Sequence, residues 1–184
     1  MFVLTSGVRL LTLALMKIYN RSDQSSAVYN TYQCYLKESC NHLEQDFKLA
    51  ANYDIPLACK LVRGAYLITE KDRFDQGLIK SYPIHQNYEA TNKSYDNAVK
   101  ACLDWLKIGK DVRITIATHN IQSVIEAVTL LEDYSCHKNS VKFAQINGLG
   151  DHISLSLTRQ GHRVLKLLPC GTVEEVLPWL GRCY

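Results

Sequence analysis

The amino-acid sequence predicts an α/β protein, and three observations support this prediction. Short apolar runs rich in β-branched and aromatic residues alternate with longer segments of helical periodicity. The alternation recurs five times, as expected for consecutive strand–helix units whose strands pair in parallel through right-handed crossovers. Polar clusters follow several of the runs, and in a barrel the carboxyl ends of the strands converge on one face and build one site.

The length of the chain leaves two architectures open. Its 184 residues are enough for a single domain, residues 1–184, with a real core. An open doubly wound sheet and a (β/α)8 barrel both fit the alternation, and the converging polar clusters favour the barrel. Because a complete barrel needs about 250 residues, we expect either an open sheet or a partial TIM-like barrel of about five of the eight units.

Periodicity justifies the elements in chain order. The apolar run from Leu10 to Met16, interrupted upstream by Arg9 and internally by Thr12, favours an amphipathic or buried helix over a targeting segment. β-Branched and aromatic runs predict strands at 27–32, Leu57–Val62, Val112–Ala117, Val141–Ile146 and 163–168. Apolar stripes predict helices at about 36–51, 92–106, 122–133, 152–160 and 173–180. Residues 66–88 form a long polar stretch, and Pro178 weakens the end of the last helix.

Composition argues against several classes of protein. The formal charge of +3 is mild and the 21 Lys and Arg are spread along the chain, so nucleic-acid binding has no support. The seven Cys are odd in number and form no C-x-x-C, which disfavours a zinc site and a disulfide framework and favours reduced thiols in an intracellular compartment. Neither a glycine-rich phosphate loop nor the G-x-S-x-G of serine hydrolases occurs.

The stretch CKLVRGAY places several chemically useful side chains at the end of one predicted strand. Side chains alternate along a strand, so Lys60 points to the face opposite Leu61. A lysine within a buried strand is costly unless it meets an anion or a polar ligand, and the alternative is an edge-strand lysine in water. Gly64 permits a positive φ or close backbone approach, and Tyr66 can pack on a flat ligand.

Two further polar motifs follow strands. Thr118, His119 and Asn120 offer a hydroxyl, an imidazole and an amide in a row, and Asn120 also suits the N-cap of the next helix. No set of Cys, His and Asp near His119 completes a metal site, so we expect no metal. The Gly-bearing turn NGLGD precedes a helix, with Asp151 as its expected cap.

Taken together, these motifs resemble the proline dehydrogenase family, in particular its single-function animal enzymes. The resemblance rests on YNTYQCYLK, KLVRGAY, YEATN, ATHN, FAQINGLGD and LPCGTVEEVLPWLGR, in that order, and covers nearly the whole chain from about Val8. It implies a distorted (β/α)8 barrel that holds FAD. The chain matches the second part of this barrel, so the domain is expected to be incomplete at its N-terminus, without the first strands and their acidic motif, and cut in its last helix.

The resemblance implies a role for each matching residue. Gln33 corresponds to the glutamine that hydrogen-bonds the pyrimidine edge of the flavin, and Lys60 to the basic position beside flavin N5. Arg63 and Gly64 match positions that line the cofactor, and Tyr66 matches the aromatic wall of the active site. The segment that holds the adenosine half of FAD corresponds to Thr118, His119 and Asn120.

The predicted substrate pocket departs from the family pattern. The family carries an Arg-Arg pair for the substrate carboxylate, and Arg182 stands at the first position with Cys183 at the second. Leu167 and Trp179 stand where the family has tyrosines that cover the substrate. Losing one charged hydrogen-bonding partner costs about 1.5–3 kcal/mol, so substrate recognition is more affected by these changes than FAD binding.

The implied reaction is the oxidation of L-proline to Δ1-pyrroline-5-carboxylate, with electrons passed through FAD to a membrane quinone. The resemblance also implies a place on the matrix side of the mitochondrial inner membrane, and no transit peptide is visible. Two alternatives stay open: a catalytically silent, truncated copy, and an enzyme that oxidises hydroxyproline.

Overall fold

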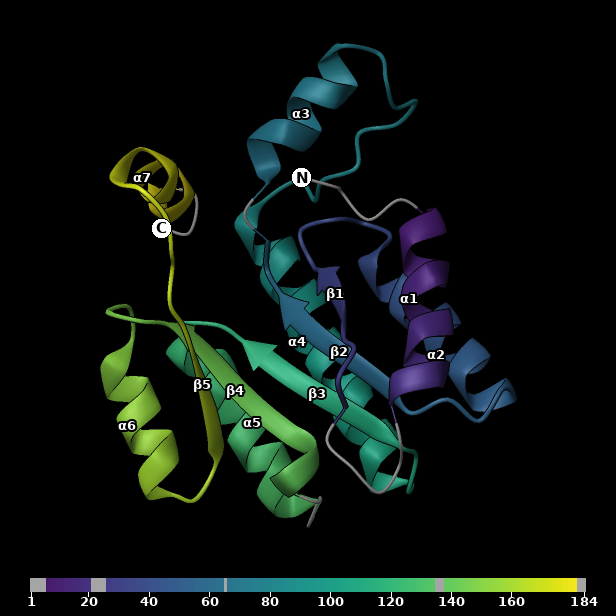
Figure 1. The fold of residues 1–184 in the computed structure, drawn as a ribbon, viewed down its shortest axis with the longest axis vertical. Coiled ribbons are helices and arrows are strands. Elements are labelled where there is room, and N and C mark those ends of the chain that lie inside the picture. Colours follow the sequence, from purple (N-terminus) through teal and green to yellow (C-terminus); the bar gives the residue numbers. More distant parts are fainter. Residues whose placement is uncertain (1–5, 21–25, 65, 135–137, 182–184) are drawn as a thin grey trace.

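The sheet of the computed structural model, which describes residues 6–20, 26–64, 66–134 and 138–181, settles the architecture (Figure 1). A doubly wound sheet reverses its strand order at a switch point, whereas a barrel adds each new strand on the same side. Here all pairs are parallel and the spatial order equals the chain order, so the fold is a partial TIM-like barrel. The strands are β1 (Asn30–Gln33), β2 (Leu57–Val62), β3 (Val112–Ala117), β4 (Val141–Ile146) and β5 (Arg163–Leu167).

The described helices leave β3 and β4 uncovered on one face of the sheet (Figure 1). They are α1 (Ser6–Tyr19), α2 (Ser39–Asn52), α3 (Leu67–Asp75), α4 (Tyr88–Lys107), α5 (Ile121–Asp133), α6 (Asp151–Arg159) and α7 (Val173–Gly181), with a short 3-10 turn at Lys138–Ser140. In Figure 1, α4 and α5 lie behind the sheet, and no described helix crosses in front of β3 and β4. Within the described ranges, no helix combines the length and the apolar character that a membrane span requires.

The main core lies between the sheet and α4. Leu61, Ile114 and Phe143 point to the helices, are fully buried, and share one buried cluster with Tyr95 and Leu103 of α4. Because side chains alternate along a strand, the residues between them point to the other side, which we call the open face. Hydrogen-bond register aligns five of these residues across the sheet, namely Thr31, Lys60, Thr115, Lys142 and Arg163.

The open face is concave. Lys142 of β4 donates a hydrogen bond of 3.2 Å from Nζ to the hydroxyl of Tyr29, which immediately precedes β1. In a flat sheet these two strands would stand about 14 Å apart, since neighbouring strands are about 4.8 Å apart. This contact across the open face fits strands that curl as they do in a barrel. It closes the amino-terminal end of the concavity.

The predicted first strand begins too early. The structure starts β1 at Asn30 instead of residue 27, because the side chain of Asn20 binds the backbone ahead of it. The Asn20 amide oxygen accepts the N–H groups of Ala27 and Val28, and its nitrogen donates to the Val28 carbonyl. These backbone groups are therefore unavailable to a strand ladder.

The long polar stretch at 66–88 contains α3, a helix that the sequence pattern did not indicate. The polar surface of α3 hides its helical periodicity. Arg73 and the buried Glu70 lie one turn apart, and their ion pair of 3.2 Å stabilises the helix. The following helix begins at Tyr88, four residues before the predicted start, because Asn87 accepts a hydrogen bond from the Ala90 amide as its cap.

The predicted cap of α6 is also wrong. Gly150, in the left-handed region at φ 74°, occupies the cap position, and Asp151 is the first helical residue. The Asp151 carboxylate pairs instead with Lys166 of β5, at the positive end of the helix dipole. The N-terminal helix prediction is confirmed, with Leu13 and Met16 of α1 buried.

Candidate functional site

Lys60 lies near the middle of the open face. It is half-buried, and none of the described residues makes a hydrogen bond or ion pair with its ammonium group. Its predicted direction, opposite Leu61, is confirmed, because Leu61 is fully buried in the core. The edge-strand alternative is wrong, since β2 pairs with both β1 and β3. A half-buried cation without a protein partner is suited to an anionic or electron-rich ligand.

Gln33 and Gly64 lie together at the carboxyl ends of β1 and β2. The Gln33 Oε1 atom is buried and has no hydrogen-bond partner in the described part of the chain. Gly64 has a φ of 118°, and a Cβ placed there would lie 1.9 Å from the Tyr35 ring and 3.1 Å from Gln33 Oε1. Only glycine fits this position, so its predicted positive φ and close approach are confirmed.

Small side chains form the centre of the open face beyond Lys60. Ala117 of β3 and Ala144 of β4 pair in register, and Leu165 of β5 follows Ala144 in the same row. The side chain of Leu167 lies one step further along β5 and is 43% exposed. The result is a shallow bed, with Lys60 on one side and apolar side chains on the other, onto which a flat ring system could fit.

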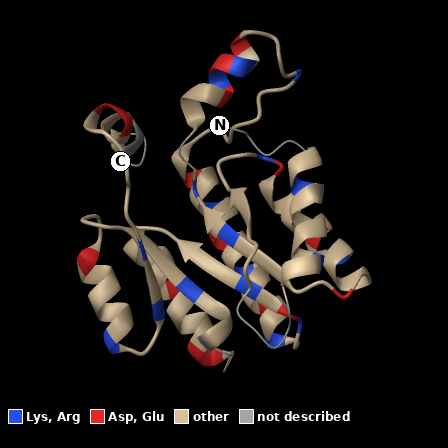
Figure 2. Ribbon diagram, viewed as in Figure 1, with Lys and Arg blue, Asp and Glu red and all other residues tan. Residues whose placement is uncertain are grey.

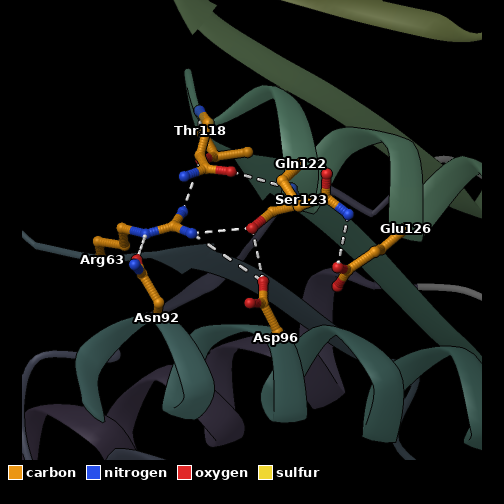
Figure 3. A network of polar contacts seen from close by, with 8 residues as sticks. Arg63, Asn92, Asp96, Thr118, Gln122, Ser123 and Glu126 are labelled. Atoms are coloured by element: carbon orange, nitrogen blue, oxygen red, sulfur yellow. Dashed lines mark hydrogen bonds and ion pairs between the residues drawn. The ribbon is translucent and has the colours of Figure 1, made fainter. Parts of the chain in front are cut away.

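Arg63 points away from this bed, to the helix side of the sheet (Figure 3). Its Nε donates to Asn92 Oδ1 at 2.6 Å, Nη1 donates to Thr118 Oγ1 at 2.7 Å, and Nη2 donates to Ser123 Oγ at 2.8 Å. Asp96 accepts from Ser123 Oγ at 2.6 Å and lies 4.0 Å from Nη2. Alternation from Leu61 could have predicted this side, but no sequence signal pairs Arg63 with these partners.

The three residues after β3 also bind the protein itself. Thr118 Oγ1 accepts the Asn120 N–H at 3.1 Å, and Asn120 Oδ1 caps α5 by accepting the Ser123 N–H, which confirms the predicted N-cap. His119 Nε2 accepts the Ile146 N–H at 2.9 Å, so its ring proton lies on Nδ1. Burial, and then the nearby Lys166 charge, hold the pKa of His119 below its ordinary value.

The residues predicted for the substrate are spread over three segments. Tyr66 is half-buried at the start of α3, and Leu167 ends β5 on the open face. Trp179 belongs to α7, which Figure 1 shows beyond the carboxyl end of β5. Its side chain and all of Arg182 lie outside the described residues.

The charges on the strands are of one sign. Figure 2 shows Lys and Arg on the strands and no acidic residue among them. The side chains are Lys60, Arg113, Lys142, Arg163 and Lys166. Arg113 and Lys166 pair with carboxylates outside the strands. Lys142 donates to the Tyr29 hydroxyl and Arg163 to the Asn139 carbonyl. The ammonium of Lys60, in contrast, has no partner among the described residues, so Lys60 is available to a ligand on the open face. No group of three or more His, Cys, Asp or Glu that could hold a metal occurs in the described ranges.

Known proteins resemble this chain in sequence and in fold. A sequence model of the family "Proline dehydrogenase" matches residues 5–183. The chain is 39% identical to the hydroxyproline dehydrogenase of Xenopus laevis over 181 residues, which are 96% of this chain and 38% of that protein. It is 36% identical over 174 residues to the mitochondrial proline dehydrogenase 1 of Homo sapiens, covering 94% of this chain and 28% of that one.

The structural similarity supports the fold alone. The crystal structure of proline utilization A from Bdellovibrio bacteriovorus, inactivated by N-propargylglycine, superposes with a TM-score of 0.80 at 21% identity. The superposed region covers 98% of this chain and 19% of the chain in that crystal structure. The chain thus spans well under half the length of the curated relatives reported above. On its sequence and its fold, it belongs to the proline dehydrogenase family.

Proposed function

We propose that this chain forms part of an FAD-dependent dehydrogenase that oxidises L-proline to Δ1-pyrroline-5-carboxylate. The observation that carries the proposal is Lys60, a half-buried cation without a protein partner at the centre of a concave face. Its position matches the basic residue that the family places beside the flavin. Membership of the proline dehydrogenase family supports the reaction class.

The residues of the open face fit a flavin. The unpaired Oε1 of Gln33 can accept a hydrogen bond from an N–H on the edge of a planar ring. The absence of a side chain at Gly64 lets the Tyr35 ring lie against the backbone beside Gln33, and the small side chains of Ala117 and Ala144 leave room for a flat ring. When bound, FAD would supply the redox chemistry, namely acceptance of a hydride from the substrate.

The protein residues would orient the reactants and adjust their charge. The Lys60 ammonium would stabilise negative charge that develops on the ring beside it. Tyr66 would form a wall of the substrate site, Leu167 and Trp179 would cover the substrate, and Arg182 would hold its carboxylate. The segment of Thr118, His119 and Asn120 would contact the adenosine half, where His119 Nδ1–H is a donor that no described residue uses.

The proposed partners follow from the same reaction. Electrons would leave through a membrane quinone, and the site of action would be the matrix side of the mitochondrial inner membrane. The relatives from Drosophila melanogaster and Homo sapiens carry the name "Proline dehydrogenase 1, mitochondrial", which supports the mitochondrial part of this proposal.

Hydroxyproline is a second candidate substrate. The Xenopus laevis hydroxyproline dehydrogenase is 39% identical to this chain, against 36% for the human proline dehydrogenase. Leu167 also replaces a family tyrosine that covers the substrate, so this chain differs from the family pattern at the substrate lid. The remaining alternative is a catalytically silent, truncated copy of the enzyme.

Cofactor retention and turnover test these proposals. The purified chain is expected to carry the visible absorbance band of bound flavin and to reduce a dye acceptor when proline is added. Lys60→Ala should bind flavin but reduce it more slowly, whereas Lys142→Ala, which changes a cation of the same row, should not. A colourless protein without proline- or hydroxyproline-dependent dye reduction would support the silent copy, and faster turnover of hydroxyproline would support the second candidate.

A further inference from the structure

The side chain of Arg63 joins four elements of the fold at one point. Arg63 itself follows β2, its partners Asn92 and Asp96 belong to α4, Thr118 follows β3, and Ser123 lies in the first turn of α5. The guanidinium also lies over the ring of the fully buried Tyr95, with 4.3 Å between its carbon and the ring centroid. With 15% of its side chain exposed, Arg63 is a largely buried cation whose three nitrogens all donate to named acceptors.

Two loops depend on these contacts. On the β2 side, Arg63 is followed by Gly64, whose φ of 118° turns the chain under the Tyr35 ring. The Arg63 carbonyl accepts the Tyr35 N–H at 2.9 Å, so the same residue also ties this turn to the end of β1. A shift of the guanidinium would therefore move the backbone beside Gln33 and Gly64 on the open face.

On the β3 side, the guanidinium sets the rotamer of Thr118. Thr118 Oγ1 accepts from Arg63 Nη1 and from the Asn120 N–H, so one hydroxyl connects the guanidinium to the backbone of the next loop. Ser123 donates its hydroxyl proton to Asp96, which leaves its oxygen lone pairs for Arg63 Nη2. The geometry of 118–123 is thereby coupled to that of Gly64 through one side chain.

We infer that Arg63 is a positioning residue that acts from behind the sheet. It couples the two loops that would hold the two halves of the dinucleotide, the Gly64 turn on the ring side and the Thr118–Asn120 loop on the adenosine side. This inference rests on the proposed function for its consequence, but the coupling is a property of the protein alone. In this role the Arg63 side chain does not contact the cofactor itself.

Two backbone amides report the coupling without any cofactor. The Tyr35 N–H donates to the Arg63 carbonyl and the Asn120 N–H donates to Thr118 Oγ1. In the full chain, Arg63→Met should raise the hydrogen-exchange rates of both amides, measured by NMR, by about tenfold or more. Arg63→Lys should do nearly the same, because one ammonium cannot reach three acceptors in the planar arrangement of a guanidinium.

Arg113→Met is the matched control. Arg113 has an 18% exposed side chain and an Asp111 partner, but lies at the opposite end of β3. It should change the exchange of the Leu57 amide, which donates to the Asp111 carbonyl, and leave the Tyr35 and Asn120 amides within about twofold of wild type. If both variants change the exchange rates of all three amides equally, Arg63 contributes only to global stability and the inference is overturned.

A second experiment measures FAD binding. It uses Asn92→Leu, since Asn92 lies on α4 behind the sheet (Figure 3). If Arg63 acts by positioning, Arg63→Met and Asn92→Leu should both weaken FAD binding, by about tenfold for Arg63→Met, and both should alter the visible spectrum of any flavin retained. Loss of FAD in Arg63→Met with wild-type affinity and spectrum in Asn92→Leu would show direct contact and refute positioning. If wild type itself binds no FAD, the proposed function fails, while the two amides still decide the coupling.

Discussion

The backbone at Gly64 has no room for a side chain, and this gives a prediction at the scale of one residue. Gly64→Ala places a methyl group 1.9 Å from Tyr35 Cδ1 and forces alanine to a φ of 118°. Overlap and backbone strain together should lower the free energy of unfolding by roughly 2–4 kcal/mol. Urea titration followed by circular dichroism measures the change.

A second glycine separates strain from overlap. Gly148 has a φ of 82° but nothing within 4 Å of an added Cβ, so Gly148→Ala should cost only the backbone term, about 1–2 kcal/mol. Tyr35→Ala should recover part of the Gly64→Ala loss in the double variant. Equal costs for the two glycine variants would contradict the overlap with Tyr35.

His119 predicts a pH dependence. Its folded-state pKa is lowered by burial and by Lys166, so the unfolded chain takes up this proton at a higher pH than the folded chain does. Stability is therefore full above about pH 6.5 and falls as pH decreases through the lowered folded pKa, because the protonated ring cannot accept the Ile146 N–H. The measurement is the free energy of unfolding at a series of pH values.

His119→Gln is the companion variant, since glutamine keeps an acceptor and does not titrate. It should lose less stability than wild type as pH falls below about 6.5. Any contribution from His42, whose pKa is also lowered by burial, is common to both proteins and cancels. Parallel stability curves for wild type and His119→Gln would exclude the assigned role of His119.

At the scale of the element, α5 begins at a cap that belongs to the candidate site. Asn120 accepts the Ser123 N–H, and its own N–H donates to Thr118, so the helix start and the loop share one residue. Asn120→Ala should cost about 1 kcal/mol of stability, as should Asn87→Ala at the start of α4. Only Asn120→Ala should also weaken FAD binding, which titration with FAD would measure. The shared role is refuted if the two variants bind FAD equally.

The elements also show what the sequence can predict. The strands β2, β3 and β4 have the predicted bounds because each is a dense apolar run in the centre of the sheet, where propensity and burial agree. The start of β1 and the presence of α3 were not predicted, because side-chain bonds decide them: a long-range one from Asn20 in the first case, a local one between Glu70 and Arg73 in the second. Such bonds are not visible as periodicity.

The candidate site was predictable to a similar degree. Lys60 and Gly64 could be chosen from alternation and from the chemistry of glycine. The structure confirms the direction of Lys60 and the positive φ of Gly64, whereas their roles toward a cofactor stay predictions. The role of Arg63 was not predictable, since its acceptors Asn92, Thr118 and Ser123 come from three later segments of the chain. Only the folded structure brings them to one guanidinium.

At the scale of the whole molecule, burial predicts a gradient of local stability. The central strands and α4 hold many of the largest fully buried side chains, whereas β5 is exposed along most of its length and α7 has no buried residue in its described part. Hydrogen exchange followed by mass spectrometry should therefore find peptides of α4 most protected and those of α7 least protected. Equal protection of α7 and α4 would mean that something in solution covers α7.

The bare edge of the sheet at β5 has a consequence for solubility. In the described part of the chain β5 pairs on one side only, with β4. With Leu165 and Leu167 exposed at 45% and 43%, its other edge is a template on which another chain can add a strand and begin to aggregate. Arg163 on one face and Lys166 on the other oppose this association by charge, as lysines do on many edge strands. Neutralising these two residues should leave the fold intact and lower the concentration at which the protein precipitates.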